Sequence, residues 1–331
     1  MRIDAANVGK RMVVRFVVPG KGPSGGPAMT DVVGRVLAVN AAHITMERRD
    51  GSSVVVNRSD VVAAKIVPPI PVRSRRAFAI SAENLTRITS RGWPAVVCEP
   101  LGEWELRAAG GFTGRANSVA VHGEAGVPFA EAIAAIGDFY AAHGLPPLAQ
   151  VIVGSDGARL FAAAGWSPVE GRPGGATVQV APISNATVSN STVSGRHEPG
   201  EVIVDDRATE AWLALYHRVD DHAVARAVLE GPATVGFLSI GDPVRAIGRV
   251  VVTGEWAGLS CVEVARDARR QGLGTRIVES SIAWASRHGA DKAYLQTTTD
   301  NVAAIALYEP YGFRTHHEYV YLEPGSRHPT S

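Results

Sequence analysis

Two kinds of hydrophobic pattern divide this chain. Over residues 8–67, short runs of β-branched residues such as MVVRFVV and DVVGRVLAV alternate with Gly-rich or Asp-Gly turns. Such runs predict antiparallel strands joined by hairpins, so we expect a small all-β barrel over residues 1–70. Prolines at positions 68, 69 and 71 follow the last run. They end any strand ladder and predict a stiff linker.

From residue 74 onward the pattern predicts strands that alternate with helices, which is typical of the α/β class. In the first series, over 74–182, the segment FAEAIAAIGDFYAAHG predicts an apolar-faced helix and AQVIVGS predicts a buried strand. A polar stretch over 184–201 separates this series from a second one, over 200–331. We therefore expect three folded parts in all.

The two α/β series follow one plan. Each has a long helix that ends in His-Gly, then a strand, then a short helix that ends in Leu-aromatic-x₃-Gly-aromatic. These endings are Leu160 to Trp166 in the first series and Leu307 to Phe313 in the second. Because the endings recur with the same flanking elements, the pattern predicts an internal duplication.

Composition and charge exclude several partners. The chain has 33 Lys+Arg against 32 Asp+Glu, a net charge of +1, so it has no general attraction to nucleic acid or to an acidic membrane surface. Charges near the start and the lack of a long apolar stretch predict a cytoplasmic protein with no membrane segment.

Cys98 and Cys261 are not part of a CxxC pair, and the His pairs lack a zinc-enzyme context. We expect neither disulfides nor a metal.

The clearest chemical signal lies where a β-branched strand runs into a Gly-rich helix start. The strand carries Val262 and Val264, and the helix start comprises Arg269, Arg270, Gln271, Gly272, Leu273, Gly274 and Thr275. The glycines allow the backbone to approach a ligand closely, and the first-turn N–H groups of a helix attract anions. Two arginines add positive charge, so this segment predicts a pyrophosphate site.

The pattern Arg269-x-x-Gly272-x-Gly274 after a Val-x-Val strand, followed about 30 residues later by Asn301, Tyr308 and Gly312-Phe313, resembles the Gcn5-related N-acetyltransferase (GNAT) superfamily. The resemblance covers about residues 205–322. The first series resembles a GNAT lobe only in its layout. The whole chain therefore resembles a tandem GNAT with a degenerate first lobe, in which mixed sheets flanked by helices follow a small SH3-like barrel.

The resemblance implies an activity and a role for each matching residue. The activity is acetyl transfer from acetyl-CoA to a primary amine by direct attack in a ternary complex. The amides of Gln271 to Thr275 would bind the coenzyme A pyrophosphate, with Arg269 and Arg270 beside them. Val262 and Val264 would pair with pantetheine and offer an N–H to the acetyl oxygen. Asn301 would contact the pantetheine arm. Tyr308 would protonate the departing thiolate.

Three questions stay open at this stage. Histone-type members carry a catalytic Glu where this chain has Gly258, so Glu255, Glu263 or a water chain could take the proton from the amine. Both carboxylates are also typical of solvated positions, and Tyr308 is also typical of a core aromatic. The acceptor could be a small-molecule amine or a protein amine. An alternative is a non-catalytic acyl-CoA-binding regulatory protein, although an intact Tyr308 and Asn301 favour the enzyme.

The first lobe is predicted to bind no coenzyme A. Its segment SVAVHGEAGVPFAEA has Pro128, which lacks an N–H, and Glu124, which places negative charge where phosphates would lie. Phe161 stands where the second lobe has Tyr308. We expect this lobe to serve the architecture or to shape the acceptor cleft.

Overall fold

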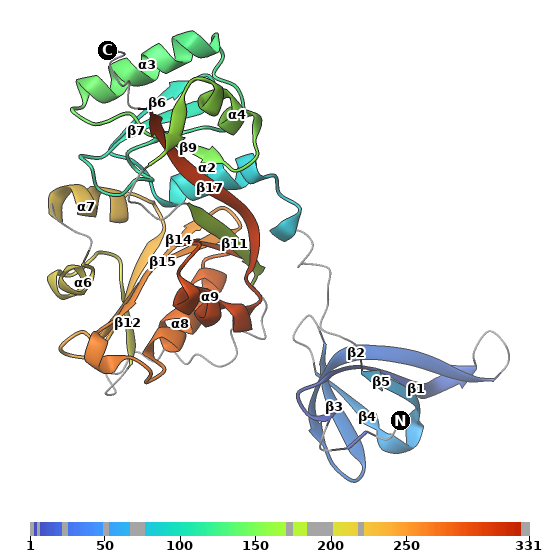
Figure 1. Ribbon diagram of the computed structural model, residues 1–331. Coiled ribbons are helices and arrows are strands. Elements are labelled where there is room, and N and C mark those ends of the chain that lie inside the picture. Colours follow the sequence, from blue (N-terminus) through green and yellow to red (C-terminus); the bar gives the residue numbers. More distant parts are fainter. Residues whose placement is uncertain are drawn as a thin grey trace, which may run out of the picture. The chain divides into compact units, whose positions relative to one another are not determined.

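The chain forms two compact units, Met1–Arg73 and Ser74–Ser331 (Figure 1). The computed structural model describes residues 3–4, 7–21, 26–48, 53–66, 77–169, 175–183, 201–217 and 222–325. The expected proline linker and the polar stretch over 184–200 lie outside these residues.

The first unit is a five-stranded antiparallel sheet with the strand order β4-β3-β2-β1-β5. Its elements are β1 (Arg11–Lys21), β2 (Pro27–Val39), β3 (His43–Arg48), β4 (Ser53–Asn57), the 3₁₀ turn η2 (Arg58–Asp60) and β5 (Val61–Ile66). Alternate residues of these strands, such as Met12, Val14 and Val36, form one apolar core. The expected small all-β unit is confirmed.

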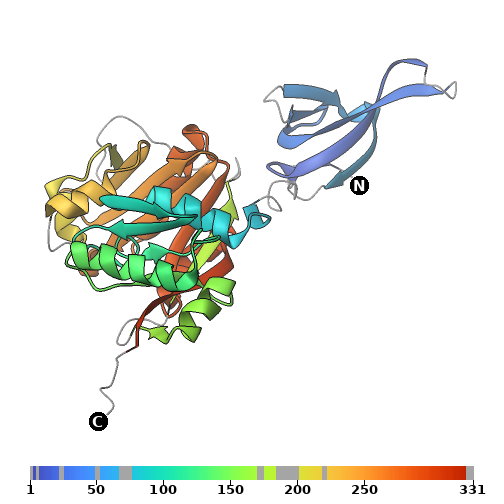
Figure 2. The same cartoon turned by 90° about the horizontal axis from the view of Figure 1, so that it is seen from above.

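The second unit is built on one mixed sheet of twelve strands (Figures 1 and 2). The first lobe contributes α2 (Ala82–Gly92), β6 (Val97–Leu101), β7 (Trp104–Ala108), β8 (Val119–Ala120), α3 (Phe129–Ala142), β9 (Ala149–Ile152), α4 (Asp156–Ala163), β10 (Trp166–Pro168) and β11 (Ala176–Pro182). The side chains of Ser81 and Ser155 accept hydrogen bonds from the first turns of α2 and α4, which explains why these helices begin there.

The second lobe contains the longer strands of the sheet. Its elements are β12 (Val202–Asp205), α6 (Glu210–Leu215), α7 (His222–Leu229), β13 (Val235–Ile240), β14 (Ala246–Thr253), β15 (Trp256–Val264), the 3₁₀ turn η3 (Arg266–Ala268), α8 (Leu273–Arg287), β16 (Lys292–Thr298), α9 (Val302–Tyr308), the 3₁₀ turn η4 (Glu309–Tyr311) and β17 (Arg314–Pro324). The α/β class is confirmed. None of the helices in the described ranges is long and apolar enough to cross a membrane.

The two lobes exchange their last strands. The strand order β12-β13-β14-β15-β16-β11-β17-β9-β8-β7-β6 places β11, from the first lobe, between β16 and β17 of the second. In return β17 pairs with β9 through Tyr319 to Leu322, and it also pairs with β10. Each lobe therefore completes the sheet of the other, and the two lobes share one continuous sheet.

Helices cover both faces of the sheet in the second lobe. Helix α8 packs Ile277, Val278 and Ile282 against β13, β14 and β15 on one face. On the other face α6 and α7 form a core around Trp212 and Phe237, to which Trp93 of the first lobe also belongs. The first lobe has its own core, which α3 and α4 help to form.

Candidate active site

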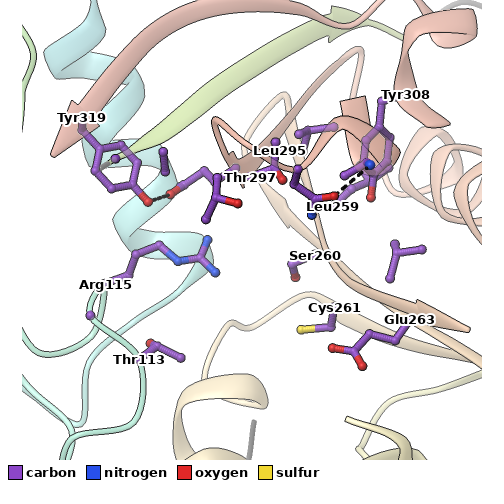
Figure 3. Close-up of a pocket in the computed structure, with 18 of the residues that line it drawn as sticks. Thr113, Arg115, Leu259, Ser260, Cys261, Glu263, Leu295, Thr297, Tyr308 and Tyr319 are labelled. Atoms are coloured by element: carbon purple, nitrogen blue, oxygen red, sulfur yellow. Dashed lines mark hydrogen bonds between the residues drawn. The ribbon is translucent and has the colours of Figure 1, made fainter. Parts of the chain in front are cut away.

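A cleft opens where two parallel strands separate. Strands β15 and β16 pair from Trp256 with Lys292 to Leu259 with Leu295, and the pairing ends there. The cleft beyond this point has a volume of about 420 Å³ and is shown in Figure 3. Its lining comes from both lobes and comprises Thr113, Gly114, Arg115, Gly175, Ala176, Tyr216, Leu259, Ser260, Cys261, Val262, Glu263, Leu295, Gln296, Thr297, Thr298, Asn301, Ala304, Tyr308, Tyr319 and Tyr321.

A β-bulge in β15 shapes the floor of this cleft. The pairing with β14 shifts between Arg249 with Ser260 and Ile247 with Glu263, and Cys261 adopts a left-handed φ of 55°. Bulges re-aim side chains next to functional sites. Val262 and Val264 pack against the core on the α8 face, whereas Cys261 packs against the core on the α6 and α7 face. The two expected pantetheine-contacting residues thus lie on the edge that β16 leaves.

The Gly-rich loop leads from β15 into α8 as the sequence predicts. Arg270 and Gly272 have left-handed φ values of 62° and 77°, and Gly272 is the N-cap of α8. This N-cap provides no side-chain hydrogen bond, and the first amides of a helix have no acceptor within the helix. The Nε atom of Arg269 donates to the Val264 carbonyl oxygen at 3.3 Å, and Gln271 Nε2 donates to the Asp267 carbonyl oxygen at 3.2 Å.

Most residues of the Gly-rich loop are accessible to a ligand from solvent. Arg269, Arg270, Gln271, Gly272 and Thr275 are exposed, and Leu273 and Gly274 are half-buried. The start of a helix with exposed arginines beside it is a typical anion-binding position.

Tyr308 and Asn301 stand at the two ends of α9, and both line the cleft. Tyr308 is 6% exposed, and its ring packs edge-on against Phe313 with a centroid distance of 5.5 Å. Burial raises the pKa of its phenol well above the usual value, and the nearby Cys261 adds to the effect. The Oδ1 atom of Asn301 accepts a hydrogen bond from Ala304 N at 3.1 Å, so the side-chain NH₂ is the group that can donate to a ligand.

The two carboxylates that could serve as a base lie at opposite ends of β15. Glu263 lines the cleft, and Figure 3 shows it beside Cys261. Glu255 lies in the turn before β15, where its Oε2 atom accepts a hydrogen bond from Lys292 Nζ at 2.6 Å. Gly258 is covered by Tyr294, because a Cβ there would lie 2.4 Å from the Tyr294 hydroxyl oxygen. The structure therefore brings Glu263, but not Glu255, to the cleft.

Sequence analysis missed the residues that the first lobe contributes to this cleft. Arg115 lies in the loop between β7 and β8, and its guanidinium carbon stacks 4.3 Å from the centroid of the Trp93 ring. Arg249 of β14, in the second lobe, is 1% exposed and approaches the same ring at 5.0 Å, although it does not line the cleft itself. Nothing in the local sequence marks these residues, because only the folding of two distant segments brings them together.

Comparisons with known proteins agree with this geometry. Residues 82–322 match the family described as "Probable histone acetyltransferase Rv0428c C-terminal". The uncharacterized N-acetyltransferase YobR of Bacillus subtilis is 30% identical over 247 residues, which span 72% of this chain and 96% of YobR. The chain belongs to the GNAT N-acetyltransferases. A solved GCN5-related N-acetyltransferase from Kribbella flavida has the same fold, with a TM-score of 0.54 and 17% identity over 74% of this chain and 96% of that one.

Two further matches concern parts of this GNAT chain. Streptothricin acetyltransferase A of Bacillus subtilis is 31% identical over 112 residues, 33% of this chain and 62% of that protein. Residues 6–65 match the family described as "Rv0428c N-terminal Sm-like domain". The first unit is thus described as Sm-like, in place of the SH3-like type that we expected, and its all-β class is as expected.

The counterpart of the Gly-rich loop in the first GNAT lobe is covered by a side chain from the turn between β6 and β7. The Oε2 atom of Glu103 accepts a hydrogen bond from Glu124 N at 3.0 Å, and its Oε1 atom accepts one from Arg87 Nη2 at 2.7 Å. A Cβ on Gly123 would lie 2.1 Å from Glu103 Oε2, so the carboxylate packs directly on the loop. Pro128 is the N-cap of α3 and makes no side-chain capping bond.

Phe161, which stands in the first lobe where the second lobe has Tyr308, is buried in an aromatic cluster. Phe161 is 0% exposed and contacts the rings of Trp104, Phe129 and Trp166, with centroid distances of 5.6, 5.3 and 4.9 Å. A phenyl ring in such a cluster has no proton to give. In the part of the chain that is described, no group of three or more His, Cys, Asp or Glu side chains could hold a metal ion.

Proposed function

We propose that the second lobe binds acetyl-CoA in the cleft between β15 and β16 and transfers the acetyl group to a primary amine within a ternary complex. One observation carries the proposal: two parallel strands separate at a cleft that the buried Tyr308 lines, and β15 continues from this cleft toward the Gly-capped start of α8. The supporting relatives are named N-acetyltransferases.

The loop before α8 and the free edge of β15 would hold acetyl-CoA. The amides of Gln271 to Thr275 face the pyrophosphate, with Arg269 and Arg270 supplying positive charge. The backbone of β15 from Ser260 onward offers hydrogen-bonding groups to pantetheine, as an added strand would use them. The side-chain NH₂ of Asn301 contacts the same arm. The acetyl carbonyl would accept an N–H from the Val262 to Val264 segment.

The reaction itself needs two proton transfers. The amine nitrogen attacks the acetyl carbonyl carbon, a C–N bond forms, and the C–S bond to coenzyme A breaks. Tyr308 gives its proton to the leaving thiolate. Because burial raises the pKa of this phenol, it keeps its proton throughout the neutral range. The proton from the amine passes to Glu263, directly or through water, because Glu263 is the acidic residue that lines the cleft.

The protonated thiol of the cleft cysteine favours direct transfer to the amine over an acetylated enzyme intermediate. Cys261 is the thiol at the cleft, and burial raises its pKa above the usual value. The thiolate is the nucleophilic form of cysteine, so this side chain is a poor acceptor at neutral pH. We therefore propose that the amine attacks acetyl-CoA without a covalent intermediate on the chain.

The test is a mass-spectrometric screen. The full chain is incubated with acetyl-CoA and a library of primary amines, and products are sought that have gained one acetyl group, while released thiol is measured in parallel. We expect acceptor-dependent release of coenzyme A with an equal amount of acetylated amine. Binding of acetyl-CoA without any acetylated amine would instead support the alternative, an acyl-CoA-binding regulatory protein.

A further inference from the structure

The first lobe delivers one arginine to the cleft on a firmly held loop. Arg115 lies in the loop between β7 and β8, and the buried side chain of Asn117 holds this loop in place. Asn117 Oδ1 accepts from Ala109 N at 2.8 Å and from Gly111 N at 3.0 Å, while its Nδ2 donates to the Phe112 and Thr113 carbonyl oxygens. With a longer bond from Nδ2 to the Ala109 carbonyl oxygen at 3.5 Å, one side chain makes five hydrogen bonds that hold the loop from which Arg115 extends.

Within the described ranges, the guanidinium of Arg115 stacks on an aromatic ring and forms no ion pair. It stacks on Trp93, whose Nε1 atom donates to Thr113 Oγ1 at 3.0 Å. Among the described residues Arg115 has neither an ion pair nor a hydrogen bond. Figure 3 shows it extending into the cleft toward the strand that carries Ser260 and Cys261. A partly buried cation in this position lacks the partner that such charges usually have.

A second cation, Arg249, lies nearby, and its hydrogen-bond partners among the described residues include no carboxylate. Arg249 donates to the Leu229 carbonyl oxygen at 2.8 Å and to the Gly92 carbonyl oxygen at 3.1 Å. It approaches the Trp93 ring that Arg115 covers, and the repulsion between the two arginines contributes to lowering its pKa, although burial contributes more. The two cations therefore raise the electrostatic potential of this side of the cleft, which attracts an anion and repels a cation.

Phenol side chains interact with Arg115. Tyr319 and Tyr321 line the same part of the cleft, and the Tyr319 hydroxyl donates to Gln296 Oε1 at 2.8 Å. One planar guanidinium surrounded by phenols matches a singly charged planar group, because arginine binds a carboxylate through two parallel hydrogen bonds. Arginine binds phosphate through the same fork, so the acceptors tested below include a phosphate-bearing amine.

We propose that the amine acceptor carries a carboxylate, as a free amino acid does, and that Arg115 binds this carboxylate while the amine faces β15. This inference rests on the proposed acetyl transfer and adds the class of acceptor. It also makes a lysine-rich protein tail a poor acceptor, because its other cations would lie against Arg115 and Arg249.

The first test compares acceptors that differ only in this charge. The full chain is assayed with acetyl-CoA and the common amino acids, each beside its C-terminal amide, together with phosphoethanolamine and a lysine-rich peptide. We expect the best amino acid to exceed its amide in kcat/KM by about 10- to 150-fold, as for one charge-assisted hydrogen-bonded pair. A preference for the amides, the phosphate or the lysine-rich peptide would overturn the proposal.

Variants then assign the preference to Arg115. We expect Arg115→Gln to remove the difference between acid and amide, with an unchanged Kd for acetyl-CoA, and Arg115→Lys to restore part of it. Arg159→Gln is the matched control, because Arg159 is an exposed arginine of the same lobe that pairs with Asp156 outside the cleft. An undiminished preference in Arg115→Gln would contradict the assignment.

A binding measurement separates this inference from the proposed reaction. N-acetylated amino acids and their N-acetylated amides are titrated into the chain saturated with coenzyme A. Tighter binding of the acids, lost in Arg115→Gln, is expected even if transfer fails. Transfer to neutral amines with no charge preference in either assay would leave the acetyltransferase standing and refute the carboxylate-bearing acceptor.

Discussion

The loop before α8 in the second lobe and the loop before α3 in the first lobe differ in the charges that surround them. In the second lobe Gly272 caps α8 without any side chain, and Arg269 and Arg270 lie beside it. In the first lobe the Glu103 carboxylate accepts the Glu124 amide hydrogen and packs on Gly123. One loop leaves its amides open to an anion from outside, whereas the other supplies an anion from its own chain.

The comparison fits our proposal that the first lobe has the layout of the second without a coenzyme site. Both lobes have a parallel strand pair, β8 with β9 and β15 with β16, linked through a helix. The exchange of β11 and β17 makes the first lobe necessary to the second, because removing it would also remove a strand between β16 and β17. The first lobe further supplies Arg115 to the cleft, a contribution that needs no coenzyme site in the first lobe.

The largest expected effect comes from filling the open loop. Gly272→Val places a side chain in open space beside the first-turn amides. Loss of two charge-assisted hydrogen bonds, worth about 1.5–3 kcal/mol each, should raise the Kd for acetyl-CoA by about 10²–10⁴-fold in calorimetry. Gly289→Val is the matched control, because Gly289 also has a left-handed φ and open space, at the other end of α8. Equal losses in both variants would mean that backbone strain alone caused the effect.

Tyr308→Phe tests the aromatic difference between the lobes. Removing the hydroxyl should lower kcat by about 10²–10⁴-fold, because the thiolate then departs without a proton, while the Kd for acetyl-CoA stays the same. The control is Tyr311→Phe, which removes the hydroxyl that donates to Glu279 outside the cleft. If Tyr308→Phe turns over at the normal rate, this residue is a core aromatic like Phe161.

Variants of Glu263 and Glu255 test which of these two carboxylates acts as the base. Glu263→Gln should lower kcat/KM by about 10²-fold, since an amide side chain cannot accept the amine proton. Glu255→Gln should leave kcat/KM unchanged, because this side chain pairs with Lys292 away from the cleft. The reverse result would assign the base to Glu255, and no effect in either variant would leave the proton to water.

The smallest effect is expected in the first lobe. Glu103→Ala removes the internal anion, but Pro128 still lacks an N–H, so we expect no second coenzyme site and an unchanged Kd. The ion pair with Arg87 is largely exposed, so the free energy of unfolding should fall by about 1 kcal/mol or less in denaturant titrations. A new binding event in Glu103→Ala would show that this carboxylate alone closes the first loop.

Local patterns predicted the elements well. The apolar-faced segments predicted α3 and α8, and the β-branched runs of the first unit predicted its strands. The opening of α8 was also readable, because Gly272 and Gly274 stand directly before a helical pattern. These features depend on neighbouring residues, so a single segment contains the information that determines them.

Contacts between distant segments could not be predicted. The exchange of β11 and β17 depends on pairing across more than a hundred positions, for which a strand pattern carries no register. The cluster of Trp93, Arg115 and Arg249 likewise joins three separate segments. In the sequence, Glu255 and Glu263 were equal candidates for the base. The structure distinguishes them, because Glu255 lies in the turn before β15 and Glu263 lines the cleft.

The number of acetyl-CoA molecules bound per chain tests the difference between the lobes most directly. Titration of the full chain by isothermal calorimetry should give one site, and the Gly272→Val variant should abolish it at the same ligand concentrations. A stoichiometry of two, or a site that survives in Gly272→Val, would contradict the account, because the first lobe would then hold the coenzyme that its Glu103 and Pro128 are argued to exclude.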